Sequence, residues 1–166
     1  MSKKTDYSEA EWKAISAAPV AAGLFITLSD ASGPVGIAKE AMAVGKAIAD
    51  SVSGDAPEVV KALAQSVKEG GGRPEMPDVP TGDRAKTQEA LMGIIKNAVA
   101  ALLAKSPTEA EGYKAWLSSV AAKVSQASKE GGFLGIGGTQ VSADEQAALD
   151  QLAAVLGVHT AQPARP

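Results

Sequence analysis

The chain has no cysteine among its 166 residues, which excludes disulfides, thiolate nucleophiles and thiolate metal ligands. Its single histidine, His159, lies in a polar C-terminal stretch, where no packed element is expected to hold it beside a serine and a carboxylate. The acids Asp144 and Glu145 are adjacent on a predicted helix and therefore point in different directions. We predict a protein that is not an enzyme and that uses no cofactor.

The chain also lacks a cluster of basic residues. Its 16 lysines and arginines are spread along the sequence, and 19 acidic residues give a net charge of −3. Binding to nucleic acid needs a concentrated basic face that can neutralise phosphates. We therefore expect no nucleic acid among its partners.

No long hydrophobic run is present. The most apolar stretch, residues 19–28, has about ten residues, roughly half of what a membrane span needs. The first residues, MSKKTDYSEAEW, contain no apolar segment typical of a secretory signal. Together these features predict a cytoplasmic protein.

Aromatic residues make up only 4% of the chain, although hydrophobic residues make up 45%. A core built mainly of alanine, valine, leucine and isoleucine favours helices that approach one another closely. No segment alternates apolar and polar residues with the period of a strand. We predict one all-α domain, a bundle of about six helices.

Three helices are predicted in the first half of the domain, residues 8–69. The first begins at Ser8, which can form a capping box with Glu11, and ends near Ser29. Pro19 predicts a kink or a break within it, because proline lacks an N–H and clashes with the preceding turn. The apolar residues after Pro19 predict that the second half of this helix is buried on all sides.

The next two helices are expected over residues 34–52 and 55–68. Gly36 and Gly45 lower the helix propensity of the first of them, and this indicates close packing against a neighbour. Asp55 is expected to cap the start of the second.

A linker over residues 70–81 is predicted to join the two halves, because its prolines recur at every third position and favour an extended path. The second half, residues 82–157, is expected to hold helices over residues 82–104, 107–129 and 143–156. Ser142 and Glu145 form the capping box of the last helix, and Gly157 ends it. We expect a flexible N-terminus (1–7) and a mobile tail (158–166) outside a single domain over residues 8–157.

The glycine-rich loop between the last two helices carries apolar residues at its tip: Phe133, Leu134 and Ile136. They either fold back as a lid on the core or form an exposed docking patch for a partner. Asp30 and Glu130, near helix ends, are weak candidates for metal ligands, but neither neighbouring loop supplies the alternating oxygen ligands that calcium needs. We therefore predict no metal site.

Two segments, residues 22–37 and 121–136, share small and apolar residues at matching positions, which suggests two related halves. Residues 121–158 resemble the helix–loop–helix of the tellurite-resistance TerB family at Gly131, Val141, Ser142, Glu145, Leu149, Leu152, Leu156 and Gly157. The resemblance implies an all-α domain in stress-related or envelope-associated systems. The loop departs from the family, because it has Lys129, Glu130 and an apolar insertion where acidic residues are expected, and this argues against transferring a metal site.

The sequence thus predicts a non-enzymatic helical interaction module that presents the loop at residues 131–138 to a protein partner or to a second copy of the chain. Two alternatives stay open. One is a helical carrier of a small apolar ligand or lipid, and the other is a protein that binds a membrane surface through the same loop.

Overall fold

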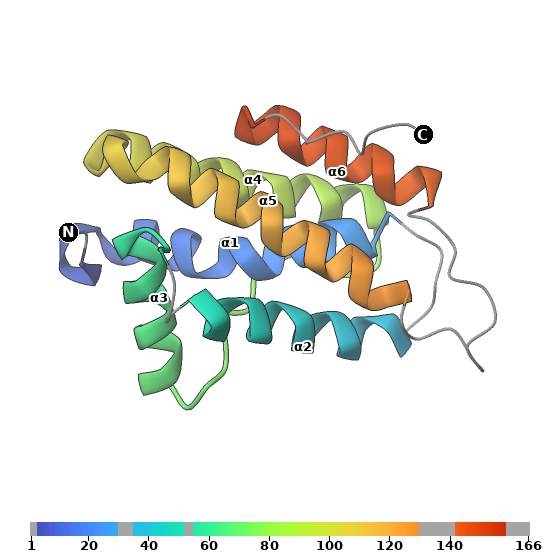
Figure 1. Cartoon of the computed structure of the whole chain (residues 1–166). Coiled ribbons are helices and arrows are strands. Elements are labelled where there is room, and N and C mark those ends of the chain that lie inside the picture. Colours follow the sequence, from blue (N-terminus) through green and yellow to red (C-terminus); the bar gives the residue numbers. More distant parts are fainter. Residues whose placement is uncertain (1–2, 30–34, 52–54, 130–141, 159–166) are drawn as a thin grey trace, which may run out of the picture.

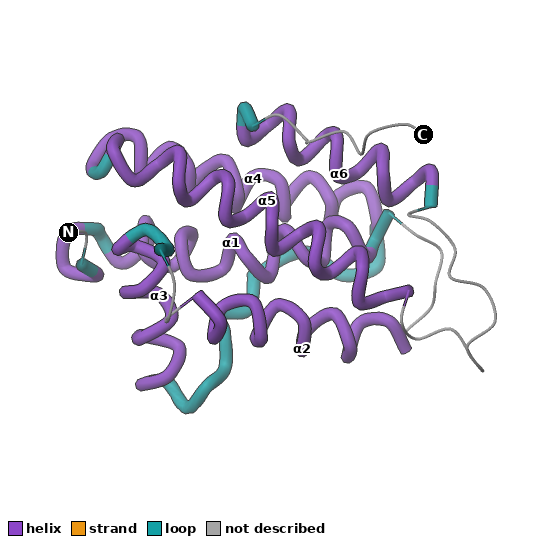
Figure 2. Tube along the Cα trace, in the orientation of Figure 1, coloured by secondary structure: helices purple, strands orange, loops and turns teal. Residues whose placement is uncertain are grey.

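The computed structural model describes residues 3–29, 35–51, 55–129 and 142–158; for residues 35–41, 128 and 129 it describes the backbone alone. Within this part of the chain the regular structure is helical, and no strand occurs (Figure 2). The elements are η1 (Lys4–Asp6), α1 (Glu9–Thr27), α2 (Val35–Asp50), α3 (Glu58–Glu69), α4 (Arg84–Lys105), α5 (Pro107–Lys129) and α6 (Ala143–Leu156). The predicted all-α bundle of about six helices is confirmed.

Helix α1 lies at the centre of the bundle, against α2, α4, α5 and α6 (Figure 1). Most of its 19 residues are buried, and from Ile15 to Thr27 only Leu24 is partly exposed. A helix that is apolar on all sides is stable only when neighbours cover every side. Helix α3 stands across the direction of the other helices, at the end of the bundle where the chain begins (Figure 1).

The predicted start signals of the first and last helices are confirmed. The Ser8 N–H donates to Glu11 Oε2 at 2.7 Å, and the Ser142 N–H donates to Glu145 Oε2 at 3.0 Å, so both capping boxes are formed. Gly157 ends α6 with a φ of 68°, a left-handed conformation that glycine adopts without steric cost.

A kink or a break was predicted at Pro19, and the break does not occur, because α1 runs through this residue without interruption. Proline removes the N–H that would have bonded to the carbonyl of Ile15, four residues earlier. The hydroxyl of Tyr113, on α5, donates to this carbonyl at 2.7 Å instead. Ile15 and Tyr113 are both 0% exposed, so water does not reach this carbonyl. Tyr113 therefore supplies the hydrogen-bond donor that the helix itself cannot provide.

The start of α3 also differs from the prediction, since Asp55 does not cap it. The helix begins at Glu58, after Pro57, and the N–H of Val59 donates to Glu109 Oε2 on α5 at 2.7 Å. Gly112, one turn after Glu109, lies against Pro57, and a Cβ at this position would come within 2.6 Å of the proline ring. Glu109, fifty positions away, therefore accepts a hydrogen bond from a backbone N–H in the first turn of α3. No local sequence signal predicts this contact.

Between α3 and α4, residues 70–83 form no helix, in agreement with the predicted linker. The segment is not detached from the domain, because Val79 is half-buried and packs against the core. Thr87 Oγ1 donates to the Pro80 carbonyl at 2.7 Å and so joins the end of the linker to the first turn of α4.

Helices α1, α2 and α5 pack closely at Gly23 and not at Gly45. A Cβ at Gly23 would lie 2.8 Å from Val44 Cγ2 on α2 and 3.4 Å from Val124 Cγ2 on α5. A Cβ at Gly45 would meet nothing within 4 Å, so the predicted close packing at Gly45 is wrong. The side-chain environment of Gly36 lies outside the described residues.

We expect Gly23→Ala to lower the free energy of unfolding, because overpacking a tight core contact costs about 1–3 kcal/mol and exceeds the gain in helix propensity. Gly45→Ala is the matched control, and it should raise stability by roughly 0.5–1 kcal/mol. Urea unfolding followed by circular dichroism measures both values. Equal effects of the two substitutions would contradict the packing described here.

Candidate functional site: a groove at the N-terminal end of the bundle

Several residues singled out in the sequence lie outside the described part of the chain. These are the loop-tip residues Phe133, Leu134 and Ile136, the weak metal candidates Asp30 and Glu130, and His159. Their roles stay predictions. Elsewhere, in the described segments, no three or more acidic or histidine side chains gather as a metal would require. Within the same residues, no helix combines the length and the apolar character needed to cross a bilayer.

The described chain contains an open groove of about 680 Å³ at the end of the bundle where the chain begins. One side comes from η1 and the first two turns of α1, and the other comes from the last turn of α3 and the residues that follow it. The lining residues are Lys4, Thr5, Tyr7, Ser8, Glu9, Trp12, Lys13, Ser16, Ser66, Val67, Gly70, Arg73 and Glu75. Most of them carry a charge or a hydroxyl group.

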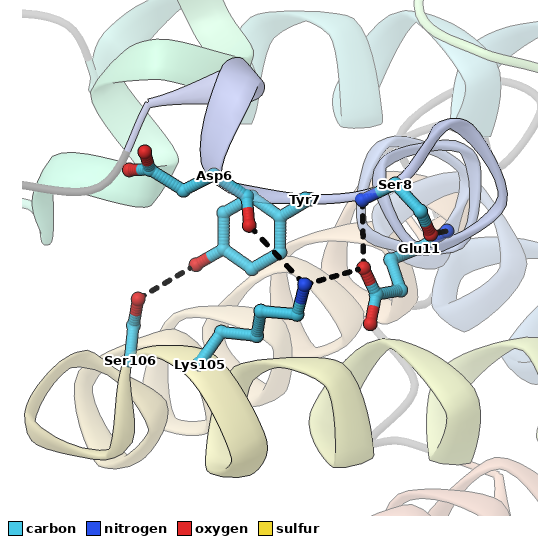
Figure 3. A network of polar contacts seen from close by, with 6 residues as sticks. All are labelled: Asp6, Tyr7, Ser8, Glu11, Lys105 and Ser106. Carbon is cyan, nitrogen blue, oxygen red and sulfur yellow. Dashed lines mark hydrogen bonds and ion pairs between the residues drawn. The ribbon is translucent and has the colours of Figure 1, made fainter.

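A polar network holds the first side of the groove in place (Figure 3). Lys105, at the end of α4, places its Nζ 3.3 Å from Glu11 Oε2 and donates to the Asp6 carbonyl at 3.4 Å. The hydroxyl of Tyr7 donates to Ser106 Oγ at 2.9 Å. Residues at the α4–α5 junction thus fix the segment that leads into α1.

Tyr7 and Trp12 form the aromatic part of the same side. Their ring centroids are 5.9 Å apart and their planes are tilted by 38°, an arrangement typical of favourable aromatic pairs. Both side chains are almost fully buried. The aromatic pair therefore joins η1 to the first turn of α1 on this side of the groove.

The second side depends on the position of α3. This helix is anchored through the hydrogen bond from Val59 to Glu109 and through four buried side chains, Val59, Val60, Leu63 and Ala64. Ser66 and Val67, which line the groove, follow these residues in the next turn. The two sides of the groove are therefore positioned by separate contacts with α4 and α5.

Five charged side chains line the groove: Lys4, Glu9, Lys13, Arg73 and Glu75. They carry an excess of one positive charge, whereas the whole chain carries a net charge of −3. All five are exposed, and none forms an ion pair with another described residue. Unpaired charges on both sides of a groove are available to a ligand.

Ser16 lines the groove from the second turn of α1 and is only 8% exposed. Its Oγ exposes less than 1 Å² and has no hydrogen-bond partner among the described residues. A buried hydroxyl group without a partner costs roughly 1–3 kcal/mol, so it is uncommon in a folded protein.

The sequence alone does not reveal this groove. Its two sides come from segments about sixty positions apart, and periodicity within one helix cannot bring them together. One signal was present: Ser16 is a polar residue in the apolar face of the first predicted helix, one turn after Lys13.

Comparisons with protein-family models, with curated protein sequences and with solved structures found no match to this chain. The resemblance of residues 121–158 to the TerB family is therefore neither supported nor contradicted.

The network in Figure 3 predicts a pH effect on stability. The Ser8 backbone N–H, the Ser8 hydroxyl and Lys105 lower the pKa of Glu11 below its ordinary value of 4.5. A lowered pKa in the folded state stabilises the protein above pH 4.5, and this contribution is lost as the pH falls through the lowered value.

Glu11→Gln should therefore lower the free energy of unfolding at neutral pH, and the difference from the unsubstituted chain should shrink as the pH falls below 4.5. Urea unfolding over a pH series measures this difference. A gap that stays constant with pH would contradict a stabilising role of the Glu11 carboxylate.

Proposed function

We propose that the chain is a non-enzymatic, cytoplasmic interaction module that binds a segment of a protein partner in the groove at the N-terminal end of the bundle. The observation that supports this best is the set of charged side chains on both sides of the groove that form no ion pair with another described residue. Exposed charges of this kind direct the approach and choice of a partner through charge complementarity.

The nature of the lining favours a peptide segment over a small apolar ligand. Pockets for small apolar molecules are lined mainly by hydrophobic side chains with few polar groups. Here the hydrophobic contribution comes from Tyr7, Trp12 and Val67, and the other side chains are charged or carry a hydroxyl group. These charged and hydroxyl-bearing side chains favour a peptide segment, and a carrier of a small apolar ligand stays the alternative.

The loop at residues 131–138 is a second, separate contact in this proposal. Its apolar tip motivated the prediction of a docking patch, with binding to a membrane surface as the alternative. The stress-related role that a TerB-like relationship would imply stays a prediction as well.

Site-specific photo-crosslinking tests the proposal. A photoreactive residue is placed at Lys13 in the groove, at Leu134 in the loop, and at Lys123 as a control on another face, and adducts formed in the native cells are identified by mass spectrometry. We expect a defined adduct from position 13, reduced at least fivefold by Arg73→Glu, and none from position 123.

An adduct whose mass equals two copies of the chain would identify the partner as a second copy. An adduct from position 134 alone would place the contact on the loop and contradict binding in the groove. The same adduct from positions 13 and 123 would show random contact and would also contradict the proposal.

A further inference from the structure

Ser16, Lys13 and Trp12 form one continuous strip on α1. Lys13 precedes Ser16 by three positions and Trp12 precedes it by four, so the three side chains lie side by side on one face of the helix. All three line the groove. The strip combines an exposed cation, a buried aromatic ring and a hydroxyl group that has no hydrogen-bond partner among the described residues.

Arg73, from the segment after α3, adds a second cation from the other side of the groove. Its guanidinium has a geometry that can hold a carboxylate through two parallel hydrogen bonds. Glu9 and Glu75 also line the two sides, so the Arg73 side is neutral and the excess of one positive charge comes from Lys4 and Lys13 on the other side. This excess favours a ligand that carries negative charge.

Hydroxyl groups occur on both sides of the lining, with Thr5 on η1 and Ser66 on α3. A hydroxyl group can both donate and accept a hydrogen bond. An extended peptide presents unpaired N–H and C=O groups along its length, and these need partners of this kind when they leave water.

We propose that the groove recognises an extended acidic peptide segment, with carboxylates bound by Lys13 and Arg73 and a polar group of the segment bonded to Ser16 Oγ. This inference rests on the proposed function and specifies the chemistry of the partner. Contact with Ser16 Oγ requires a local rearrangement, because this atom is closed to water in the structure.

Trp12 provides a direct readout of binding. The chain has two tryptophans, so Trp116→Phe leaves Trp12, which lines the groove, as the sole tryptophan, and its emission is excited selectively at wavelengths where tyrosine does not absorb. This chain is titrated with a decapeptide of alternating glutamate and serine, with the same peptide carrying glutamine in place of glutamate, and with inorganic phosphate. We expect the glutamate peptide to bind at least tenfold more tightly than the glutamine peptide, with an affinity that falls as salt is added.

Lys13→Gln and Arg73→Gln should each weaken the glutamate peptide by fivefold or more. The matched controls are Lys46→Gln and Lys123→Gln, which alter cations along the recess between α2 and α5 and should leave the affinity unchanged. Equal loss in the test and control pairs would show a general charge effect and overturn the proposal.

Ser16→Ala separates a binding role from a structural one. The substitution removes a buried hydroxyl without a partner among the described residues, so the melting temperature should stay constant or rise. Affinity for the glutamate peptide should fall about fivefold to tenfold, as expected for one lost hydrogen bond. An unchanged affinity would overturn the assignment of Ser16.

The outcomes also distinguish this inference from the proposed function. Equal binding of the two peptides, or phosphate binding as tight as the glutamate peptide, would overturn the acidic-segment proposal. If the adduct at position 13 persisted in that case, the groove would still be the contact site, with a partner of different chemistry. If that adduct were also missing, both proposals would fail.

Discussion

The hydrogen bond from the Tyr113 hydroxyl to the Ile15 carbonyl is the interaction on which the rest of this bundle depends. Helix α1 passes through the centre of the domain and contains Pro19, so one of its carbonyl groups loses its helical partner in a place that water does not reach. An unpaired carbonyl there would cost roughly 1–3 kcal/mol, a large part of the stability of a small domain. Burial also raises the pKa of Tyr113 far above its ordinary value, so the hydroxyl keeps its proton and remains a donor.

The same face of α5 organises the end of the bundle that carries the groove. Gly112 follows Glu109 by three positions and Tyr113 follows it by four, so all three residues share one face of α5. Tyr113 fixes α1, Glu109 satisfies the first turn of α3, and Gly112 leaves room for Pro57. Contacts with α5 thereby position both α1 and α3, and Lys105 and Ser106 additionally hold the segment that leads into α1.

The helix pattern could be predicted because its signals are local. Capping boxes at Ser8 and Ser142, the glycine at position 157 and the apolar periodicity all act within a few residues. The predictions that failed concern contacts between distant segments. The break at Pro19 is avoided by a tyrosine on another helix, α3 is capped by a glutamate fifty positions away, and the tight glycine is Gly23 instead of Gly45. The groove also depends on a contact between distant segments, because nothing in the sequence of η1 and α1 indicates that the end of α3 lies opposite them.

A double-mutant cycle on Tyr113 and Pro19 tests the central claim most directly. Tyr113→Phe removes the hydroxyl donor, and Pro19→Ala restores a backbone N–H that can bond to the Ile15 carbonyl. The free energy of unfolding of the four chains, measured in urea, gives the coupling between the two positions. We predict that Tyr113→Phe costs about 1–3 kcal/mol in the chain with Pro19 and at least 1 kcal/mol less in the chain with alanine at this position. An equal cost in both chains would contradict this account, because the tyrosine would then stabilise the domain by packing alone.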